Sequence, residues 1–273
     1  MPGRKKPLVS VIMNCRNGEK FLYKSVKSVL KQTYKNLELI FWDNISTDNS
    51  KKIIKKFKDK RIRYFCSKKP IKLYQARNCA IKKAKGKYVT FIDVDDWWVN
   101  KKTSKQVELL EKNNSADLAY SKCWIFYQNN STKKIIPKHA LPEGKIFNHL
   151  LKNYYLGLLT VMVKRKIFKK HSFNNKYNII GDFDLFMKIS FSSKFLSDNS
   201  PLAYYRIHNE NLTKKNWIEQ INELNNWRIK NKKKLNLGKN IPIWVKKNIF
   251  TLRLKAIINL IFPGFLINRI INF

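Results

Sequence analysis

The sequence predicts an α/β fold in which a mostly parallel, Rossmann-like central sheet is flanked by helices. Two observations carry this prediction. Apolar runs rich in β-branched and aromatic residues alternate with helical stretches, and short polar clusters follow the ends of several of these runs. At 273 residues the chain suits one large domain with a smaller appendage.

The alternation is clearest over residues 8–98. Each apolar run is short enough for a strand, and the stretches between the runs repeat apolar residues at helical spacing. The predicted strands are 8–13, 37–42, 62–66 and 87–92, and the predicted helices are 17–33, 48–57, capped by Ser46 or Thr47, and 74–86, stopped by Gly86. This succession predicts a half-Rossmann, nucleotide-binding architecture.

The remainder of the chain is less regular. Residues 99–215 indicate further strands and loops, and a lysine-rich stretch gives a boundary near residue 235. We therefore expect one domain over 1–235, with a nucleotide-binding half over 8–98 and an acceptor half over 99–215, followed by a helical tail over 236–273. In that tail, apolar residues from Phe250 to Ile261 share one helical face, which suits either an interfacial helix or a helix packed on the domain.

Charge and cysteine content limit the partners and the compartment. The formal charge of +39 predicts attraction to anions, although a biased composition explains the excess lysine equally well. Four scattered cysteines without a CxxC pair indicate reduced thiols, and the apolar run Leu8–Met13 is too short for the core of a signal peptide. We expect a cytoplasmic protein.

Three polar clusters follow predicted strands, at the sheet edge where ligands of such folds bind. They are Asn14–Asn17, Asp43–Asn44 and Asp93–Asp96, and no glycine-rich phosphate loop accompanies them. Alternation along an extended segment would send Asp93 and Asp95 to the same side, forming an oxygen site suited to Mg²⁺ or Mn²⁺. The alternative is a polar turn with no metal.

The three polar clusters belong to a series of five separated sequence blocks. The blocks read VSVIMNCRNGEKFL, LELIFWDNISTDNS, ARNCAIKKAKGKYVTFIDVDDWW, GDFDLFMKIS and YYRIHNENLT, over about residues 8–213. Their order and spacing resemble the family 2 glycosyltransferases, which are GT-A-type, inverting and dependent on a nucleotide sugar. The resemblance implies a GT-A-type fold and transfer of a hexosyl or related glycosyl group.

The resemblance also implies roles for individual residues. Asp182 would be the catalytic base, although Gly181 replaces the glutamate that commonly precedes it, and Asp182 and Asp184 would otherwise simply favour the start of a helix. Trp97 or Trp98 would contact the acceptor unless it belongs to the core. The implied donor-binding residues are Asn17, Asp43, Arg77, Asn78, Asp93, Arg206 and His208, and the implied metal ligands for Mg²⁺ or Mn²⁺ are Asp95, Asp93 and His208.

The expected partners follow from these roles. We expect a nucleotide-sugar donor, with UDP as its nucleotide, and a saccharide or lipid-linked saccharide as acceptor in bacterial surface polysaccharide or lipopolysaccharide synthesis. The charge and the tail predict peripheral contact with an anionic membrane, at the cytoplasmic face of the inner membrane.

Two rival functions are compatible with parts of the sequence. A non-enzymatic nucleic-acid or polyanion-binding protein would use the positive charge, but no nucleic-acid-binding signature is present and we expect no nucleic-acid partner. A nucleotidyltransferase on a related fold would need a glycine-rich loop that the chain lacks.

Overall fold

The computed structural model describes residues 6–212, 216–233 and 250. The chain divides into two compact units, one of residues 1–147 and 155–208 and one of residues 148–154 and 209–273. Apart from Phe250, the apolar face predicted for the tail lies outside the described residues.

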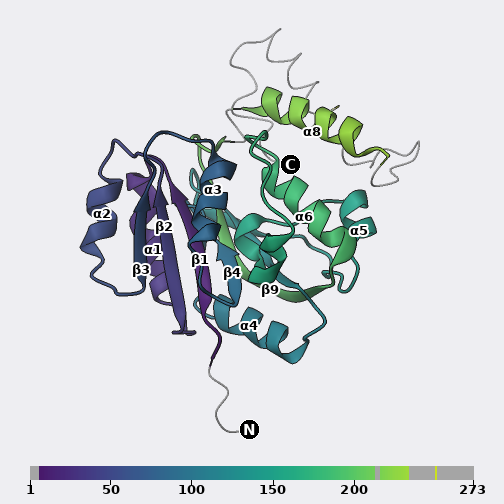
Figure 1. The fold of residues 1–273 in the computed structure, drawn as a ribbon, viewed down its shortest axis with the longest axis horizontal. Helices are drawn as coiled ribbons and strands as arrows, with labels where there is room; N and C mark the ends of the chain where they lie inside the picture. Colours follow the sequence, from purple (N-terminus) through teal and green to yellow (C-terminus); the bar gives the residue numbers. More distant parts are fainter. Residues whose placement is uncertain (1–5, 213–215, 234–249, 251–273) are drawn as a thin grey trace. The chain divides into compact units, whose positions relative to one another are not determined.

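The first half of the first unit is a parallel α/β layer. Strands β3, β2, β1 and β4 lie side by side in that order, and all their pairings are parallel (Figure 1). The strand order reverses direction after β3, so right-handed crossovers place α1 and α2 on one face and α3 on the other. The bounds are β1 Val9–Cys15, α1 Glu19–Leu30, β2 Leu37–Asp43, α2 Ser50–Lys56, β3 Ile62–Cys66, α3 Leu73–Lys82 and β4 Tyr88–Phe91.

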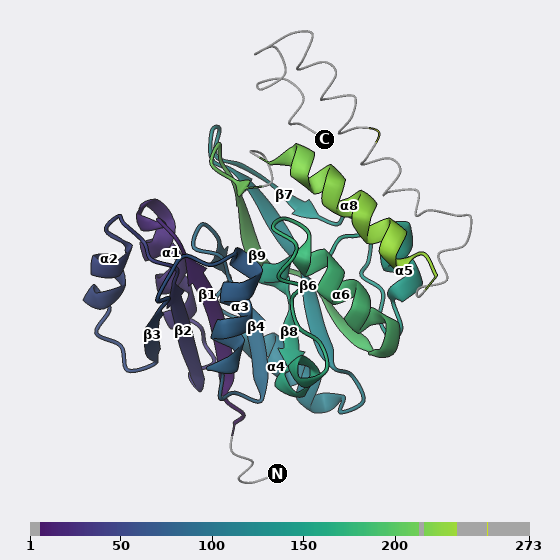
Figure 2. The same cartoon turned by 45° about the horizontal axis from the view of Figure 1, so that its top comes forward.

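The second half extends the same sheet with mixed pairing. Strand β8 pairs antiparallel with β4 and joins it to β6, which runs parallel to the long strand β9 (Figure 2). The bounds are β5 Trp97–Trp98, α4 Lys102–Lys112, β6 Leu118–Tyr127, β7 Thr132–Ile136, α5 Phe147–Lys152, η1 Leu158–Thr160, β8 Met162–Lys164, η2 Arg165–Lys169, α6 Gly181–Ser192 and β9 Phe195–Ile207.

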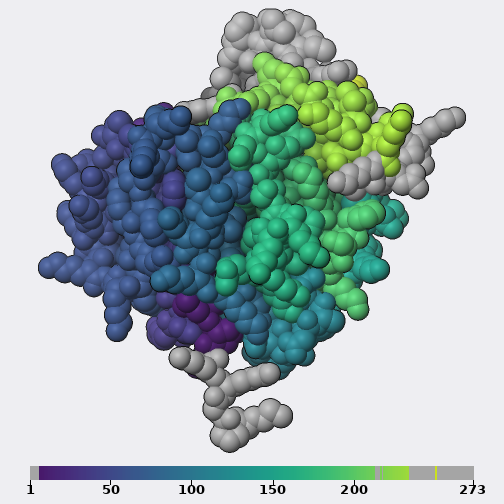
Figure 3. Space-filling model, in the orientation of Figure 1, coloured from purple at the N-terminus to yellow at the C-terminus, as the bar shows by residue number. Residues whose placement is uncertain are grey.

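The core of the first unit lies around the central strands. All seven residues of β1 are buried, because its hydrophobic run faces helices on both sides. In the space-filling view, purple residues of the N-terminal region surface only in small patches (Figure 3). The parallel strands and the helices between them confirm the α/β architecture that the alternation predicted.

Two local predictions were wrong. Helix α2 begins at Ser50 with Asn49 at its N-cap, so neither Ser46 nor Thr47 caps it. Helix α3 ends at Lys82, before Gly86. Gly86 is instead needed for close packing, because a Cβ there would lie 2.7 Å from the Leu8 carbonyl oxygen and from the Ser10 nitrogen.

The second unit contains α8, Trp217–Asn231. This helix buries Ile221, Leu224 and Trp227 at a spacing of one helical turn. Within the part of the chain that the structure describes, no helix is both long enough and apolar enough to span a membrane.

Candidate functional site

The acidic loop that follows β4 sends its three carboxylates to different partners. Asp93 Oδ1 accepts a hydrogen bond from Arg77 Nη2 at 2.7 Å, and Asp95 Oδ2 lies 3.0 Å from His208 Nε2. Asp96 is buried, and its Oδ1 accepts a hydrogen bond from the backbone nitrogen of Arg206 at 2.9 Å. Strand β4 ends at Phe91, so strand alternation does not set these directions. Contacts from α3 and β9 set them instead.

Asp95 and His208 form the pair that suits a divalent cation. Arg206 Nε donates to the Asp95 carbonyl oxygen at 2.7 Å, and the Phe21 ring lies 4.7 Å from the His208 ring, centroid to centroid. A carboxylate oxygen and an imidazole nitrogen side by side fit Mg²⁺ or Mn²⁺ with an incomplete protein shell. Among the described residues, no three His, Cys, Asp or Glu side chains gather into a metal site. A cation here would therefore need diphosphate oxygens and water as its other ligands.

Asp96 is an acid of a different kind. Burial, and then the charges of Asp95 and Asp93, raise its pKa well above the usual value, while the Arg206 amide opposes the shift. Because its carboxyl group is directed at the backbone of β9, Asp96 fixes the strand that carries Arg206 and that ends just before His208.

The loops after β1 and β2 are tied together. Asn17 adopts a left-handed conformation (φ 55°), and its Oδ1 accepts a hydrogen bond from Thr47 N at 2.8 Å. Asp43 is buried, and its two oxygens accept hydrogen bonds from Ser46 N at 2.8 Å and from the Tyr64 hydroxyl at 2.7 Å. Burial, followed by the hydrogen bond to Asp43, raises the pKa of Tyr64, so this phenol stays a donor. Asn17 and Asp43 thus lie in one ordered loop pair at the carboxyl edge.

Helix α3 contributes Arg77 and Asn78. Arg77 is buried against Asp93, so it is not an exposed charge on the helix surface. Asn78 Nδ2 donates to the Phe173 carbonyl oxygen at 2.8 Å, and its Oδ1 accepts from Phe173 N at 3.0 Å. Asn78 therefore anchors the loop that leads toward α6.

Asp182 lies in the first turn of α6. Its Oδ1 accepts hydrogen bonds from Phe183 N at 2.9 Å and from the Tyr74 hydroxyl at 3.3 Å. Burial raises the pKa of Asp182, and the positive charge of Arg77 only partly opposes this. Asp184 differs, because it forms an ion pair with Lys188 at 2.6 Å one turn along the helix. The two acids of this block are thus distinct: Asp184 is paired within its own helix, whereas Asp182 contacts α3.

The two tryptophans after the acidic loop separate. Trp98 is 2% exposed and its indole Nε1 donates to the Leu159 carbonyl oxygen at 3.1 Å, so it belongs to the core. Trp97 is half-buried and stacks on Tyr204, with ring centroids 4.7 Å apart and planes at 9°. The Arg206 guanidinium lies 4.7 Å from the Trp97 ring centroid. Of the two, only Trp97 retains exposed surface next to the site.

Sequence reasoning missed three residues that shape this edge: Phe21, Tyr64 and Tyr74. Each is an aromatic residue whose position in a helix or strand signals core packing, and nothing in its local sequence indicates a polar partner. Gly181 stands where the family resemblance implies a glutamate, and this was the one sign in the sequence that the surroundings of Asp182 differ.

The fold and this acidic edge define an α/β protein whose sheet carries a ligand site at the carboxyl ends of its strands. The chain belongs to glycosyl transferase family 2, whose model matches residues 10–190. It is a glycosyltransferase, and the predicted family is confirmed.

Similar proteins include two Escherichia coli enzymes described as UDP-Glc:alpha-D-GlcNAc-diphosphoundecaprenol beta-1,3-glucosyltransferases. WfaP is 34% identical over 80% of this chain and 84% of its own length. WfgD is 38% identical over 61% of this chain, and the match spans 64% of WfgD. The putative teichuronic acid biosynthesis glycosyltransferase TuaG of Bacillus subtilis is 32% identical over 78% of this chain and 84% of its own length.

Solved structures support the GT-A-type fold. S. aureus TarS in complex with UDP superimposes with a TM-score of 0.61 at 17% identity, over 93% of this chain and 72% of TarS. The mannosyltransferase PcManGT from Pyrobaculum calidifontis, in complex with GDP-Man and Mn²⁺, gives a TM-score of 0.61 at 16% identity, over 94% of this chain and 71% of that one.

Proposed function

We propose that this glycosyltransferase moves a hexosyl or related group from a nucleotide-diphosphate sugar, with UDP as the nucleotide, to an acceptor hydroxyl with inversion at the anomeric carbon. One observation carries the proposal. Asp182, a half-buried carboxylate with a raised pKa, occupies the same unit as the Asp95 and His208 pair. A base and a diphosphate site are the two elements that a single displacement requires.

The residues divide the work as follows. Asp182 receives the proton of the acceptor hydroxyl as that oxygen attacks the anomeric carbon, and no covalent intermediate is needed. Arg206 presents positive charge beside Asp95, where the departing diphosphate gains charge. Asp95 and His208 would hold Mg²⁺ or Mn²⁺, which neutralises diphosphate oxygens when bound. Donor binding is assigned to Asn17, Asp43, Arg77, Asn78 and Asp93.

The acceptor is proposed from relatives and from the surface. The activities described for WfaP and WfgD favour a diphosphate-lipid-linked saccharide as acceptor, and therefore a role in surface polysaccharide synthesis. Trp97 is the proposed acceptor contact, since it keeps exposed surface next to the site whereas Trp98 is buried. Contact with an anionic membrane at its cytoplasmic face remains a prediction that rests on net charge and on the tail.

Product analysis tests the proposal. The purified protein is incubated with UDP-sugars and a lipid-linked saccharide with and without Mn²⁺, and NMR gives the anomeric configuration of the product. We expect inversion with release of a nucleoside diphosphate. Retention of configuration would contradict the single displacement, and release of pyrophosphate would instead identify a nucleotidyltransferase.

A further inference from the structure

The first residue of α6, Gly181, packs directly against the ring of Tyr74. A Cβ at position 181 would lie 2.5 Å from Tyr74 Cδ2 and Cε2 and 2.7 Å from Cγ. Side-chain atoms do not approach so closely, and an aromatic ring cannot bend away. Tyr74 is 2% exposed and stacks on Phe173 at 5.4 Å, so the ring is fixed in place.

The same ring excludes the glutamate that the resemblance leads one to expect at this position. An acid there would favour the first turn of the helix, whereas glycine weakens a helix. The chain therefore gives up helix stability at position 181. The Tyr74 ring occupies the space that a side chain at position 181 would fill.

The hydroxyl group of Tyr74 reaches the carboxylate next to this glycine. Its oxygen lies 2.7 Å from the Ile179 carbonyl oxygen and 3.3 Å from Asp182 Oδ1, so its single hydrogen is shared between these two acceptors. Phe183 N also donates to Oδ1, at 2.9 Å. Both donors use Oδ1, which leaves Oδ2 of Asp182 to receive a proton.

We propose that Tyr74 is a positioning residue for Asp182. The inference rests on the proposed function, in which Asp182 is the base. The ring shields one side of the carboxylate from water, and the hydroxyl fixes its rotation so that Oδ2 faces the acceptor. The Arg77 guanidinium lies 5.2 Å from the ring centroid of Tyr74 and also pairs with Asp93, so Tyr74 links the base to the acidic loop.

The Tyr74→Phe variant separates positioning from packing, because it keeps the ring and removes only the hydroxyl. We expect kcat to fall roughly tenfold with an unchanged donor KM, since one hydrogen bond to a charged group is lost. A donor lowers the pKa of a carboxylate, so its loss raises that pKa and moves the acid limb of the kcat/KM profile to higher pH. The charged groups that face Asp182, Arg77 and Asp93, are retained in this variant. Wild-type kcat with an unshifted profile would overturn the proposal.

The packing of Gly181 against the Tyr74 ring is tested separately. Gly181→Ala in the wild-type background should lower Tm and activity, because the new methyl group meets the ring. In a Tyr74→Ala background, which removes the ring, the same substitution should cost little. Equal effects of Gly181→Ala in both backgrounds would contradict the packing argument.

Asp182→Asn, assayed in parallel, separates this inference from the proposed function. Full activity of Asp182→Asn would show that the base is misassigned. An inactive Asp182→Asn beside a Tyr74→Phe variant with wild-type kinetics would leave the base in place and refute only the role of Tyr74.

Discussion

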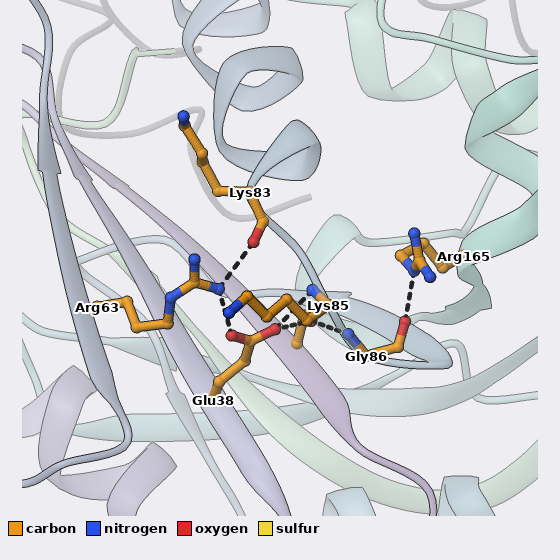
Figure 4. Close-up of polar contacts among 7 residues, drawn as sticks. Glu38, Arg63, Lys83, Lys85, Gly86 and Arg165 are labelled. Carbon is orange, nitrogen blue, oxygen red and sulfur yellow. Dashed lines mark hydrogen bonds and ion pairs between the residues drawn. The ribbon is translucent and has the colours of Figure 1, made fainter.

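Acidic side chains lie at both ends of the parallel strands, but they meet different surroundings. At the amino end, Glu38 of β2 is buried and accepts hydrogen bonds from Ser10 Oγ at 2.6 Å, Lys85 N at 2.7 Å and Arg63 Nη1 at 2.5 Å (Figure 4). At the carboxyl end, Asp182 has two donors on one oxygen. Burial raises the pKa of Asp182 and the positive charge of Arg77 opposes this rise, but Arg77 forms its ion pair with Asp93 instead.

The pKa directions of the two acids express this difference. Burial pushes the pKa of Glu38 upward, but the bonds from Ser10, Lys85 and Arg63 outweigh it and leave the pKa lowered. Burial of Asp182 is not outweighed, and its pKa is raised. An acid with donors on both oxygens is a structural element, whereas an acid with donors on only one oxygen is ready to take up a proton at the other.

Asp182→Asn should have the largest effect on turnover. An amide cannot accept the proton of the acceptor, so we expect kcat to fall by roughly a thousandfold while donor KM changes little. Steady-state kinetics with saturating acceptor measure this loss. Asp184→Asn is the matched control, since Asp184 pairs with Lys188 and should tolerate the change with most of its turnover retained. Equal losses in both variants would indicate damage to α6 rather than loss of a base.

Removal of one proposed metal ligand should have the next largest effect. His208→Ala keeps Asp95 but removes the neighbouring nitrogen, so we expect the Mn²⁺ concentration for half-maximal activity to rise roughly tenfold to a hundredfold. Titration of EDTA-treated protein with Mn²⁺ measures the shift. An unchanged metal requirement would mean that His208 serves only to hold Asp95.

Glu38→Gln should weaken the fold without affecting chemistry. Loss of the charge leaves Arg63 without its ion pair, and we expect the free energy of unfolding to fall by about 2 kcal/mol. Because the folded pKa of Glu38 is lowered, this stabilisation is present above the unfolded pKa of about 4.3 and is lost as pH falls through the folded pKa. Urea unfolding at neutral and acidic pH checks both statements. A substitution cost that persists in acid would contradict them.

Asp182→Asn should show the opposite and smaller effect on stability. A raised pKa means that ionised Asp182 costs stability above its folded pKa, so its removal should increase the free energy of unfolding by about 1 kcal/mol at pH 7. The gain should vanish in acid, where the carboxyl group is protonated in both states. If both substitutions destabilised the protein at pH 7, the contrast between the two acids would be lost.

The sequence predicted the parallel half of the sheet well, because strand and helix periods there are unambiguous over residues 8–92. The family resemblance also predicted that Asp95 and His208 lie at one site, although the two residues are far apart in the sequence. The sequence could not predict that Asp93 pairs with Arg77, or that Trp98 is buried. Those outcomes depend on tertiary contacts from α3 and η1 to the loop after β4. The close packing of Gly181 against the Tyr74 ring could not be predicted either, because the two residues are far apart in the sequence.

Measurements of donor binding distinguish a donor site at the carboxyl edge of the sheet from a surface that binds polyanions. Wild type, Asp95→Ala and Glu38→Gln are titrated calorimetrically with UDP, GDP and UDP-sugars, with and without Mn²⁺. We expect base-selective, Mn²⁺-dependent binding in wild type and in Glu38→Gln, and loss of this binding in Asp95→Ala. Binding that follows only phosphate charge, ignores the base and survives in Asp95→Ala would contradict a donor site at the carboxyl edge and favour a polyanion-binding protein.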